Sequence, residues 1–208
     1  LPIYDKPMIY YPLSNMMSIG IKEILIITTP FDFDRFKFLL GDGSKWGIKI
    51  QYVFEKDPLG TAGALGLLPK NIPDLPIIMM NGDILTKVNF KQLLEYHKKN
   101  SAIATMCMRK YSFQVPYGVI EIKNNNVINI EEKPTHQSFI NAGIYVLDQK
   151  IISQINGFDY IDMPTLIKNQ IDLNETVNSF PIHEYWIDIG RINQLDKANQ
   201  EVSLMFNQ

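Results

Sequence analysis

The segment Pro76-Ile-Ile-Met-Met-Asn-Gly-Asp83 is an apolar run that ends beside a glycine and a carboxylate. A similar pattern closes Glu184-Tyr-Trp-Ile-Asp-Ile-Gly190, which contains Asp188. Such runs are typical of buried strands. If both belong to one mostly parallel sheet, Asp83 and Asp188 lie near its carboxyl edge, where open α/β sheets bind ligands. Two hard oxygen donors there predict a Mg²⁺ site, to which a substrate's phosphates usually contribute.

Strand and helix patterns alternate between residues 21 and 100. Apolar segments are followed by segments with helical spacing, of which residues 89–100 are the clearest example. This alternation predicts an α/β fold with a doubly wound, mostly parallel sheet. The expected strands are residues 21–29, 48–55 and 76–83, and the expected helices are residues 32–40, 61–68 and 89–100.

After residue 100 the pattern changes to short strand-like segments separated by turn residues such as Asn124-Asn-Asn126. The pattern after residue 100 predicts a smaller antiparallel subregion, which we expect to face the substrate as a lid. Helical patterns return towards the end of the chain. The expected strands are residues 102–110, 118–123, 127–132, 140–147 and 177–189, and the expected helices are residues 148–155, 163–171 and 193–206.

Length and composition exclude several classes of protein. The 208 residues suffice for one domain with a substantial core, and a net charge near −2 leaves no basic surplus to attract nucleic acid. No stretch reaches the roughly 18 apolar residues of a membrane span, and no segment has the pattern of a signal peptide. Cys107 lies in an apolar run and is predicted to be a buried thiol. We expect a cytoplasmic protein. Any phosphorylated ligand must be held by groups at its binding site, because the protein as a whole carries no positive net charge.

Two further segments carry groups suited to such a ligand. In Asp57-Pro-Leu-Gly-Thr-Ala-Gly-Ala64, glycines at a strand-to-helix junction allow close backbone approach, although such junctions need glycine for packing alone. In Val127-Ile-Asn-Ile-Glu-Glu-Lys-Pro134, a lysine can neutralise phosphate and a carboxylate can bind sugar hydroxyls. A surface charge cluster is the simpler explanation of that segment taken alone. Both alternatives stay open on these residues.

Taken in order along the chain, these segments resemble the sugar-1-phosphate nucleotidyltransferases, also called NDP-sugar pyrophosphorylases. The resemblance covers essentially the whole chain, and the order of the motifs is its specific part. The segments that carry it are Leu1-Pro-Ile-Tyr-Asp-Lys-Pro-Met-Ile-Tyr-Tyr-Pro-Leu13, Leu40-Gly-Asp-Gly-Ser-Lys-Trp-Gly47, Pro58-Leu-Gly-Thr-Ala-Gly63, Asn81-Gly-Asp83, Tyr117-Gly-Val119, Glu131-Glu-Lys-Pro134, Asn141-Ala-Gly-Ile-Tyr145 and Trp186-Ile-Asp-Ile-Gly190.

The resemblance implies a Rossmann-like nucleotide-binding fold and a reaction that joins an NTP and a sugar 1-phosphate into an NDP-sugar, with release of pyrophosphate. It implies that Asp83 and Asp188 bind the divalent metal and act in catalysis with Lys133. By the same resemblance, Glu132 and Lys133 hold the sugar and its phosphate, and Gly60 and Thr61 line the nucleoside pocket. It also implies that Gly82 binds substrate. The residues implied to line the sugar pocket are Tyr117, Gly118 and Asn141.

The sequence departs from the family at its start. The family's glycine-rich loop, with a catalytic arginine and lysine, normally precedes the Leu-Pro-Ile-Tyr segment together with the first central strand, and neither occurs here. We therefore expect one nucleotidyltransferase domain over residues 1–208 that lacks these parts and is inactive, or nearly so, by itself. Lys6 matches a different lysine of the family and is no substitute.

The two halves of the chain point to different branches. Residues 1–50 resemble glucose-1-phosphate thymidylyltransferases, whereas residues 55–190 resemble guanylyl-type and amino-sugar-activating enzymes. The thymidylyl branch usually has a glutamine in place of Gly63 and an asparagine in place of Ile84. The nucleotide base that the protein accepts therefore stays open. A noncatalytic sugar-phosphate sensor or assembly subunit of the same fold is the alternative, which the missing loop favours and the retained aspartates oppose. A homo-oligomer also stays open.

Overall fold

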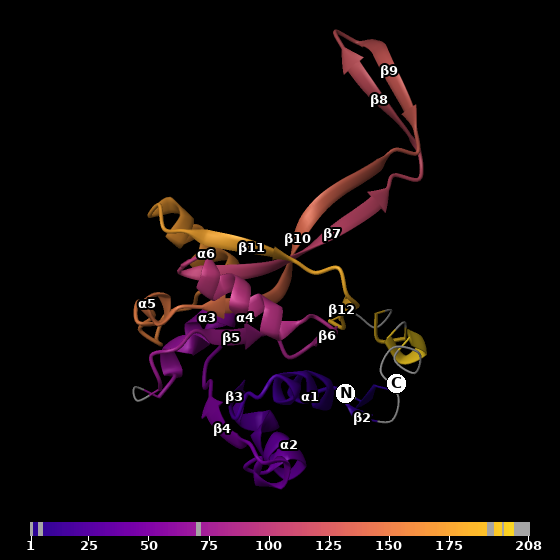
Figure 1. Cartoon of the computed structure of the whole chain (residues 1–208). Helices are drawn as coiled ribbons and strands as arrows, with labels where there is room; N and C mark the ends of the chain where they lie inside the picture. Colours follow the sequence, from indigo (N-terminus) through magenta and orange to yellow (C-terminus); the bar gives the residue numbers. More distant parts are fainter. Residues whose placement is uncertain (1, 4–5, 70–71, 191–193, 197, 202–208) are drawn as a thin grey trace.

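The largest sheet of the protein has four strands, in the order β11 (Val177–Pro181), β7 (Ala104–Gln114), β10 (Thr135–Leu147) and β5 (Ile77–Met80). The computed structural model describes residues 2–3, 6–69, 72–190, 194–196 and 198–201. β11 runs parallel to β7, whereas β10 runs antiparallel to both of its neighbours. The predicted α/β fold is confirmed, with one antiparallel strand inside its main sheet (Figure 1).

A separate parallel pair of strands, β3 (Glu23–Thr28) and β4 (Lys49–Phe54), lies below this sheet in Figure 1. The crossover between them contains α2 (Pro30–Leu40) and a short 3₁₀ turn, Ser44–Trp46. Pro30 stands in the first turn of α2, and the side-chain oxygen of Thr29 accepts a hydrogen bond from Asp32 N over 3.3 Å. Both residues are typical of a helix start. The buried aliphatic residues of this unit are Ile26, Leu40, Ile48 and Ile50, and Leu13 from the helix before β3 joins their cluster.

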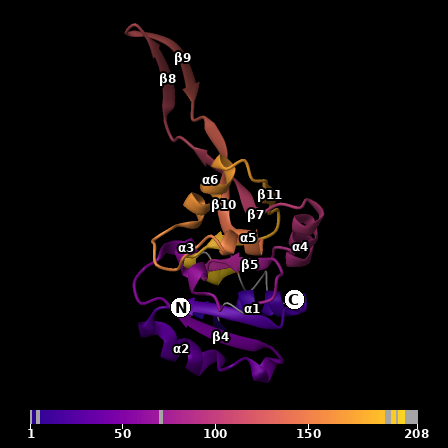
Figure 2. The same ribbon diagram turned by 90° about the vertical axis from the view of Figure 1, so that its left-hand side faces the viewer.

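Helices pack on both faces of the four-stranded sheet. α4 (Phe90–Lys99) places Phe90 and Leu93 in one core cluster with Ile144 and Val146 of β10. The next residues in the strand's alternation, Tyr145 and Leu147, belong to the other cluster. That cluster contains residues of α3 (Gly60–Gly63), its 3₁₀ extension Ala64–Leu67, α5 (Gln149–Ile152) and α6 (Met163–Asp172). Figure 2 shows α4 and α6 flanking the sheet.

Shorter strands complete one edge of the core. β6 (Ile84–Thr86) pairs antiparallel with β12 (Trp186–Asp188), and β1 (Pro2–Ile3) pairs with β2 (Lys6–Pro7). α1 (Tyr10–Ser18) lies against β6, since Asn15 Nδ2 donates a hydrogen bond to the carbonyl oxygen of Thr86 over 2.6 Å. This edge therefore joins the beginning, the middle and the end of the chain.

Beyond Met108 and Asn141, β7 and β10 leave the sheet as a ribbon that continues into the hairpin of β8 (Gly118–Lys123) and β9 (Asn126–Glu132). We call residues 110–139 the arm. Within the described part of the chain, no third strand pairs with it. Both views show the arm projecting away from the core (Figures 1 and 2). The predicted antiparallel subregion therefore exists, but in this structure it does not cover the core as a lid.

Some predicted boundaries were wrong. The predicted strand 177–189 is divided into β11 and β12, because residues 182–185 carry the chain from one sheet to the next. β7 and β10 extend beyond their predicted ends into the arm, and the predicted helix 148–155 shortens to α5. Of the predicted helix 193–206, residues 194–196 and 198–201 are helical and the others lie outside the described residues. No described helix is long and apolar enough to cross a membrane.

Candidate active site

Asp83 and Asp188 come together at the ladder between β6 and β12. Asp83 directly precedes β6, and Asp188 ends β12 in register with Ile84. The carbonyl oxygen of Asp83 accepts a hydrogen bond from Ile189 N over 2.9 Å, which ties the two segments together. Asp188 Oδ1 accepts a hydrogen bond from Gly190 N, also over 2.9 Å. The two carboxylates therefore converge, although an antiparallel ladder brings them together and not the shared parallel edge that the sequence suggested.

The surroundings of the pair disfavour two negative charges without a counterion. Partial burial raises the pKa of Asp83, and the negative charge of Asp188 raises it further. Gly190 borders both groups, since a Cβ at that position would lie 3.1 Å from Asp188 Oδ1 and 3.6 Å from Asp83 Oδ2. A side chain there would occupy the space beside both carboxylates. The pair and Gly190 thus form a small acidic cradle that a cation would neutralise.

The donor set of this cradle fits a hard divalent cation. Among the described residues, His, Cys, Asp and Glu side chains form no group of three or more that could hold a metal. A zinc site needs three or four protein ligands. In contrast, Mg²⁺ keeps several waters and is commonly held by one or two carboxylates together with substrate phosphates. Two aspartates without a third protein ligand match the second pattern.

The turn that contains Gly60 and Thr61 is fixed against the segment before α6. Gly60 has a φ of +74°, and a Cβ there would lie 2.7 Å from the carbonyl oxygen of Ile161. Thr61 N donates to Asp162 Oδ1 over 3.3 Å, and Thr61 Oγ1 accepts a hydrogen bond from Met163 N over 2.8 Å. The glycine is therefore required by packing and by its backbone conformation. The same contacts hold the turn in one position.

One groove connects this turn with Asp83. Its volume is about 1470 Å³, and Gly60, Thr61, Gly82 and Asp83 all line it. Its walls include the adjacent edges of β3 and β5, which are rich in isoleucine and methionine. The structure therefore brings the residues predicted for the nucleoside and one of the predicted metal ligands to the same groove.

The residues predicted to hold the sugar phosphate lie on the arm. Lys133 Nζ is 3.9 Å from Glu132 Oε1, and both side chains are more than half exposed. Lys133 has a φ of +49°, and its N–H donates to the carbonyl oxygen of Tyr117 over 3.3 Å. A Cβ at Gly118 would lie 3.0 Å from Glu132 Oε2. These four residues gather with one another at the core-side ends of β8 and β9, a hairpin that projects away from β6 and β12 in Figure 1.

Asn141 stands at the base of the arm, between these two groups. Its Oδ1 accepts a hydrogen bond from Gly143 N over 3.0 Å, and its Nδ2 donates to the Tyr145 hydroxyl. The carbonyl oxygen of Gly143 accepts a hydrogen bond from Asn81 N over 3.0 Å, two residues before Asp83. Asn141 is therefore linked to the core edge that holds the aspartates, unlike the residues on the arm.

A model of the nucleotidyl transferase family matches residues 1–203. The chain belongs to this family. The mannose-1-phosphate guanyltransferase of Yarrowia lipolytica is 32% identical over 198 residues, which cover 90% of this chain and 53% of that protein. A glucose-1-phosphate thymidylyltransferase of Neisseria meningitidis serogroup A is 39% identical over 160 residues, which cover 73% of this chain and 54% of that protein. The chain spans about half the length of these curated relatives.

Solved structures share the nucleotidyl transferase fold. A Bacillus anthracis structure in complex with a sucrose, described as a candidate glucose-1-phosphate thymidylyltransferase, has a TM-score of 0.77 at 26% identity and covers 96% of this chain and 84% of its own. HddC from Yersinia pseudotuberculosis has a TM-score of 0.72 at 24% identity and covers 97% of this chain and 88% of its own. The second likeness shows the fold alone.

Two residues of this nucleotidyl transferase domain were not predicted from the sequence as part of the site. Asp162 anchors Thr61 and lines the groove, and Gly190 borders both aspartates. Asp162 immediately precedes α6, a position where an aspartate usually serves as a helix cap, so nothing in the sequence connects it with Thr61. Gly190 follows a strand, where glycine is common in turns. Only the folded chain shows what each of them touches.

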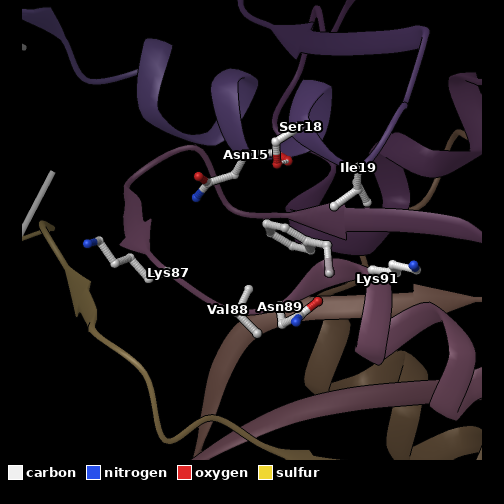
Figure 3. A pocket seen from close by; sticks show the side chains of 8 residues that line it. Asn15, Ser18, Ile19, Lys87, Val88, Asn89 and Lys91 are labelled. Atoms are coloured by element: carbon white, nitrogen blue, oxygen red, sulfur yellow. Dashed lines mark hydrogen bonds between the residues drawn. The ribbon is translucent and has the colours of Figure 1, made fainter. Parts of the chain in front are cut away.

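A second, smaller hollow of about 480 Å³ lies between α1 and the start of α4 (Figure 3). Its polar lining comes from Asn15, Ser18, Lys87, Asn89 and Lys91. Asn89 caps α4 by accepting a hydrogen bond from Gln92 N over 3.0 Å, and Asn15 holds the carbonyl oxygen of Thr86. These asparagines have structural roles in the nucleotidyl transferase core, so the hollow has no bearing on the predicted substrate residues.

Proposed function

We propose that this chain is the larger part of a sugar-1-phosphate nucleotidyltransferase domain, which joins a nucleoside triphosphate and a sugar 1-phosphate into an NDP-sugar and pyrophosphate. The observation that carries the proposal is the convergence of Asp83 with Asp188, since Asp83 lines the same groove as Gly60 and Thr61. A scaffold protein has no use for two neighbouring carboxylates of which one, Asp83, is partly buried beside the charge of the other. In a metal-dependent reaction of phosphates, both aspartates would bind the metal ion.

The proposed reaction needs alignment and charge neutralisation more than covalent chemistry. A phosphate oxygen of the sugar 1-phosphate forms a bond to the α-phosphorus of the triphosphate, and the bond from that phosphorus to the oxygen bridging to the β-phosphorus breaks. Pyrophosphate leaves with the bonding electrons. Asp83 and Asp188 would hold Mg²⁺, which when bound offsets the phosphate charge as a Lewis acid. No residue needs to form a covalent intermediate.

The remaining predicted residues would bind and orient the two substrates. Gly60 and Thr61 would hold the nucleoside, because their turn is fixed at the groove by Asp162. Lys133 would neutralise the sugar's phosphate as a point charge, and Glu132 would accept hydrogen bonds from sugar hydroxyls. Tyr117, Gly118 and Asn141 would form the rest of the sugar pocket, with Gly82 at the groove edge. The arm would have to approach the core for these groups to meet one substrate.

We also propose that the groove between β3 and β5 receives one further strand, followed by the glycine-rich loop that the family resemblance implies. β3 is paired only with β4, and β5 only with β10, in the described part of the chain. Their facing edges both line the groove, so each offers backbone N–H and C=O groups to a strand placed between them. An apolar strand suits the isoleucine and methionine lining. It would join the two sheets into one and deliver the loop beside Asp83.

The nucleotide and the sugar are the finer part of the proposal. A Cβ at Gly63 would lie 2.6 Å from the carbonyl oxygen of Asp159, so no glutamine fits at this position unless that segment moves. This observation favours a guanylyl-type over a thymidylyl-type base pocket. Relatives of both names match the chain, and the sugar is open within the family's sugar 1-phosphates.

The decisive experiment measures pyrophosphate release in the presence of Mg²⁺. We would join the first strand and glycine-rich loop of the Neisseria meningitidis relative to this chain and offer a grid of triphosphates and sugar 1-phosphates. Release from one pair, with loss in Asp83→Asn, would support the transferase and identify its substrates. The chain without the added segment is expected to be inactive or weakly active. Asp172→Asn, at the end of α6 and outside the groove lining, is the matched control.

The separation of the arm from the aspartate pair favours one alternative, a noncatalytic sugar-phosphate sensor. If the folded chimaera binds a sugar 1-phosphate but releases no pyrophosphate from any pair, the transferase proposal is wrong. Binding that does not change when Mg²⁺ is withdrawn would then support the sensor.

A further inference from the structure

One face of the β8–β9 hairpin is apolar and exposed. In the antiparallel register, Ile120 lies opposite Ile130, and Ile122 lies opposite Val127. A register shift next to these pairs brings Ile128 to the same side. All five side chains are between 50% and 65% exposed. We call Ile120, Ile122, Val127, Ile128 and Ile130 the arm's apolar face. The opposite face carries charged and polar groups, namely Glu121, Lys123, Asn129 and Glu131, beside Val119.

A hairpin of this kind is not expected to stand alone in water. Isolated two-stranded hairpins are marginally stable at best, and independent stability requires a third strand or a packed face. The arm has no third strand within the described part of the chain, and its contour from Lys110 to Lys123 extends over roughly 45 Å at about 3.4 Å per residue. The turn at Asn124 and Asn125 fixes the register but buries nothing, as both have positive φ in an exposed tip. Some surface must therefore cover the apolar face.

The layout of the arm fits a second copy of itself. The apolar face contains no charged side chain between its ends. It is bounded by the amide side chains of Asn124, Asn125 and Asn126 at the tip and by Glu132 beside Gly118 at the base. When two such faces pack with their arms antiparallel, aliphatic side chains meet aliphatic side chains, and the amide donors of one tip meet the Glu132 carboxylate of the other base. A two-fold contact of this kind requires one self-complementary patch, and the arm supplies it.

We propose that two copies of this chain associate through the arm's apolar face, packed antiparallel about a two-fold axis. Five aliphatic side chains on each copy give a contact smaller than the roughly 800 Å² per partner of a standard stable interface. The dimer is therefore weak, and dilution dissociates it.

Sedimentation equilibrium of the chain over a range of concentrations tests the association. We expect a monomer–dimer equilibrium that Ile130→Asp weakens about tenfold or more, since a charge at the centre of the contact is left without water or partner. Val119→Asp is the matched control, because it adds the same charge to the polar face of the same hairpin and should leave the equilibrium unchanged. Thermal unfolding checks both variants, and neither should lower the midpoint of the core.

Cysteine cross-linking gives a second measurement that does not depend on how a charged variant folds. Cys107 is buried, and burial raises the pKa of its thiol to about 12, so it does not compete as a thiolate. A bifunctional thiol reagent that spans the roughly 10 Å between packed sheets should link two Ile120→Cys copies, whereas Val119→Cys on the other face should stay monomeric. A monomer at every concentration, or equal behaviour of the two faces in both assays, overturns the proposal. Neither assay uses substrate, so neither outcome depends on the proposed catalytic function.

Discussion

The core edge that holds Asp83 and Asp188 and the arm that holds Glu132 and Lys133 carry motifs of similar specificity, yet the fold treats them differently. Paired strands, a backbone hydrogen bond and Gly190 fix the aspartates. The arm residues are fixed only relative to one another, on a ribbon whose side chains are largely exposed. A motif therefore determines a local arrangement reliably, whereas its place relative to the rest of the site depends on packing that the motif does not encode.

The largest expected contrast between the two regions is in stability. Leu147 is fully buried in the core, so Leu147→Ala is expected to lower the free energy of unfolding by about 2–5 kcal/mol. Ile122→Ala on the arm should lower it by less than about 0.5 kcal/mol, because Ile122 is already 59% exposed. Urea unfolding in dilute protein measures both. Equal losses would mean that the arm packs against the core in solution.

The second contrast concerns catalysis in the chimaera. Asp188→Asn is expected to reduce the rate of pyrophosphate release at least about a hundredfold, because one of the two predicted metal ligands loses its charge. Asp172→Asn at the end of α6, which forms a surface ion pair with Lys168, serves as the control and should change little. A variant Asp188→Asn that keeps its rate would remove the aspartate pair from the proposed mechanism.

A smaller effect is expected on the arm. Lys133→Ala should raise KM for the sugar 1-phosphate about tenfold, as one charge-assisted contact to phosphate is lost. Lys123→Ala, beside the tip of the same arm, should leave KM unchanged. Steady-state kinetics with the productive substrate pair separates the two lysines. Identical KM values would assign Lys133 to the surface charge cluster that its sequence alone also allows.

The smallest predicted effect is a pH-dependent change in stability at the aspartate pair. The pKa of Asp83 is raised by burial and by Asp188, so folding favours its protonated form. This stabilising contribution is complete below the ordinary aspartate pKa and is lost as the pH rises through the raised value. At pH 7, Asp83→Asn should therefore raise Tm, on the order of 1 °C, and the gain should shrink in acid. Mg²⁺ should raise the Tm of the wild type only.

Much of the fold followed from local patterns. The alternation between residues 21 and 100 indicated β3, α2, β4, β5 and α4. The sequence did not show that residues 182–185 separate β11 from β12, since the apolar pattern continues through Ile182. It also did not show the exposed position of the arm. Its residues Ile120 and Ile130 resemble those of a buried strand, and only the absence of a third described strand distinguishes them.

The candidate site was predicted less completely. The convergence of Asp83 and Asp188 was expected, but the strand order that produces it was not, because pairing between β6 and β12 spans about a hundred residues of sequence. The contact between Asp162 and Thr61 is of the same long-range kind. Periodicity reports which face of an element is buried and carries no information about which distant element covers it.

The tip of the arm has a consequence for how the chain folds. Asn124 and Asn125 both have left-handed backbones, the conformation of a tight hairpin turn, and the strands on either side of them are neighbours in sequence. A hairpin forms within about 1–10 μs, far faster than distant strands find each other. Zipping from this turn inward would pair β8 with β9, then β7 with β10, until Ala104 reaches Leu147. The outermost part of the molecule is thus placed to nucleate the strand pair at the centre of its main sheet.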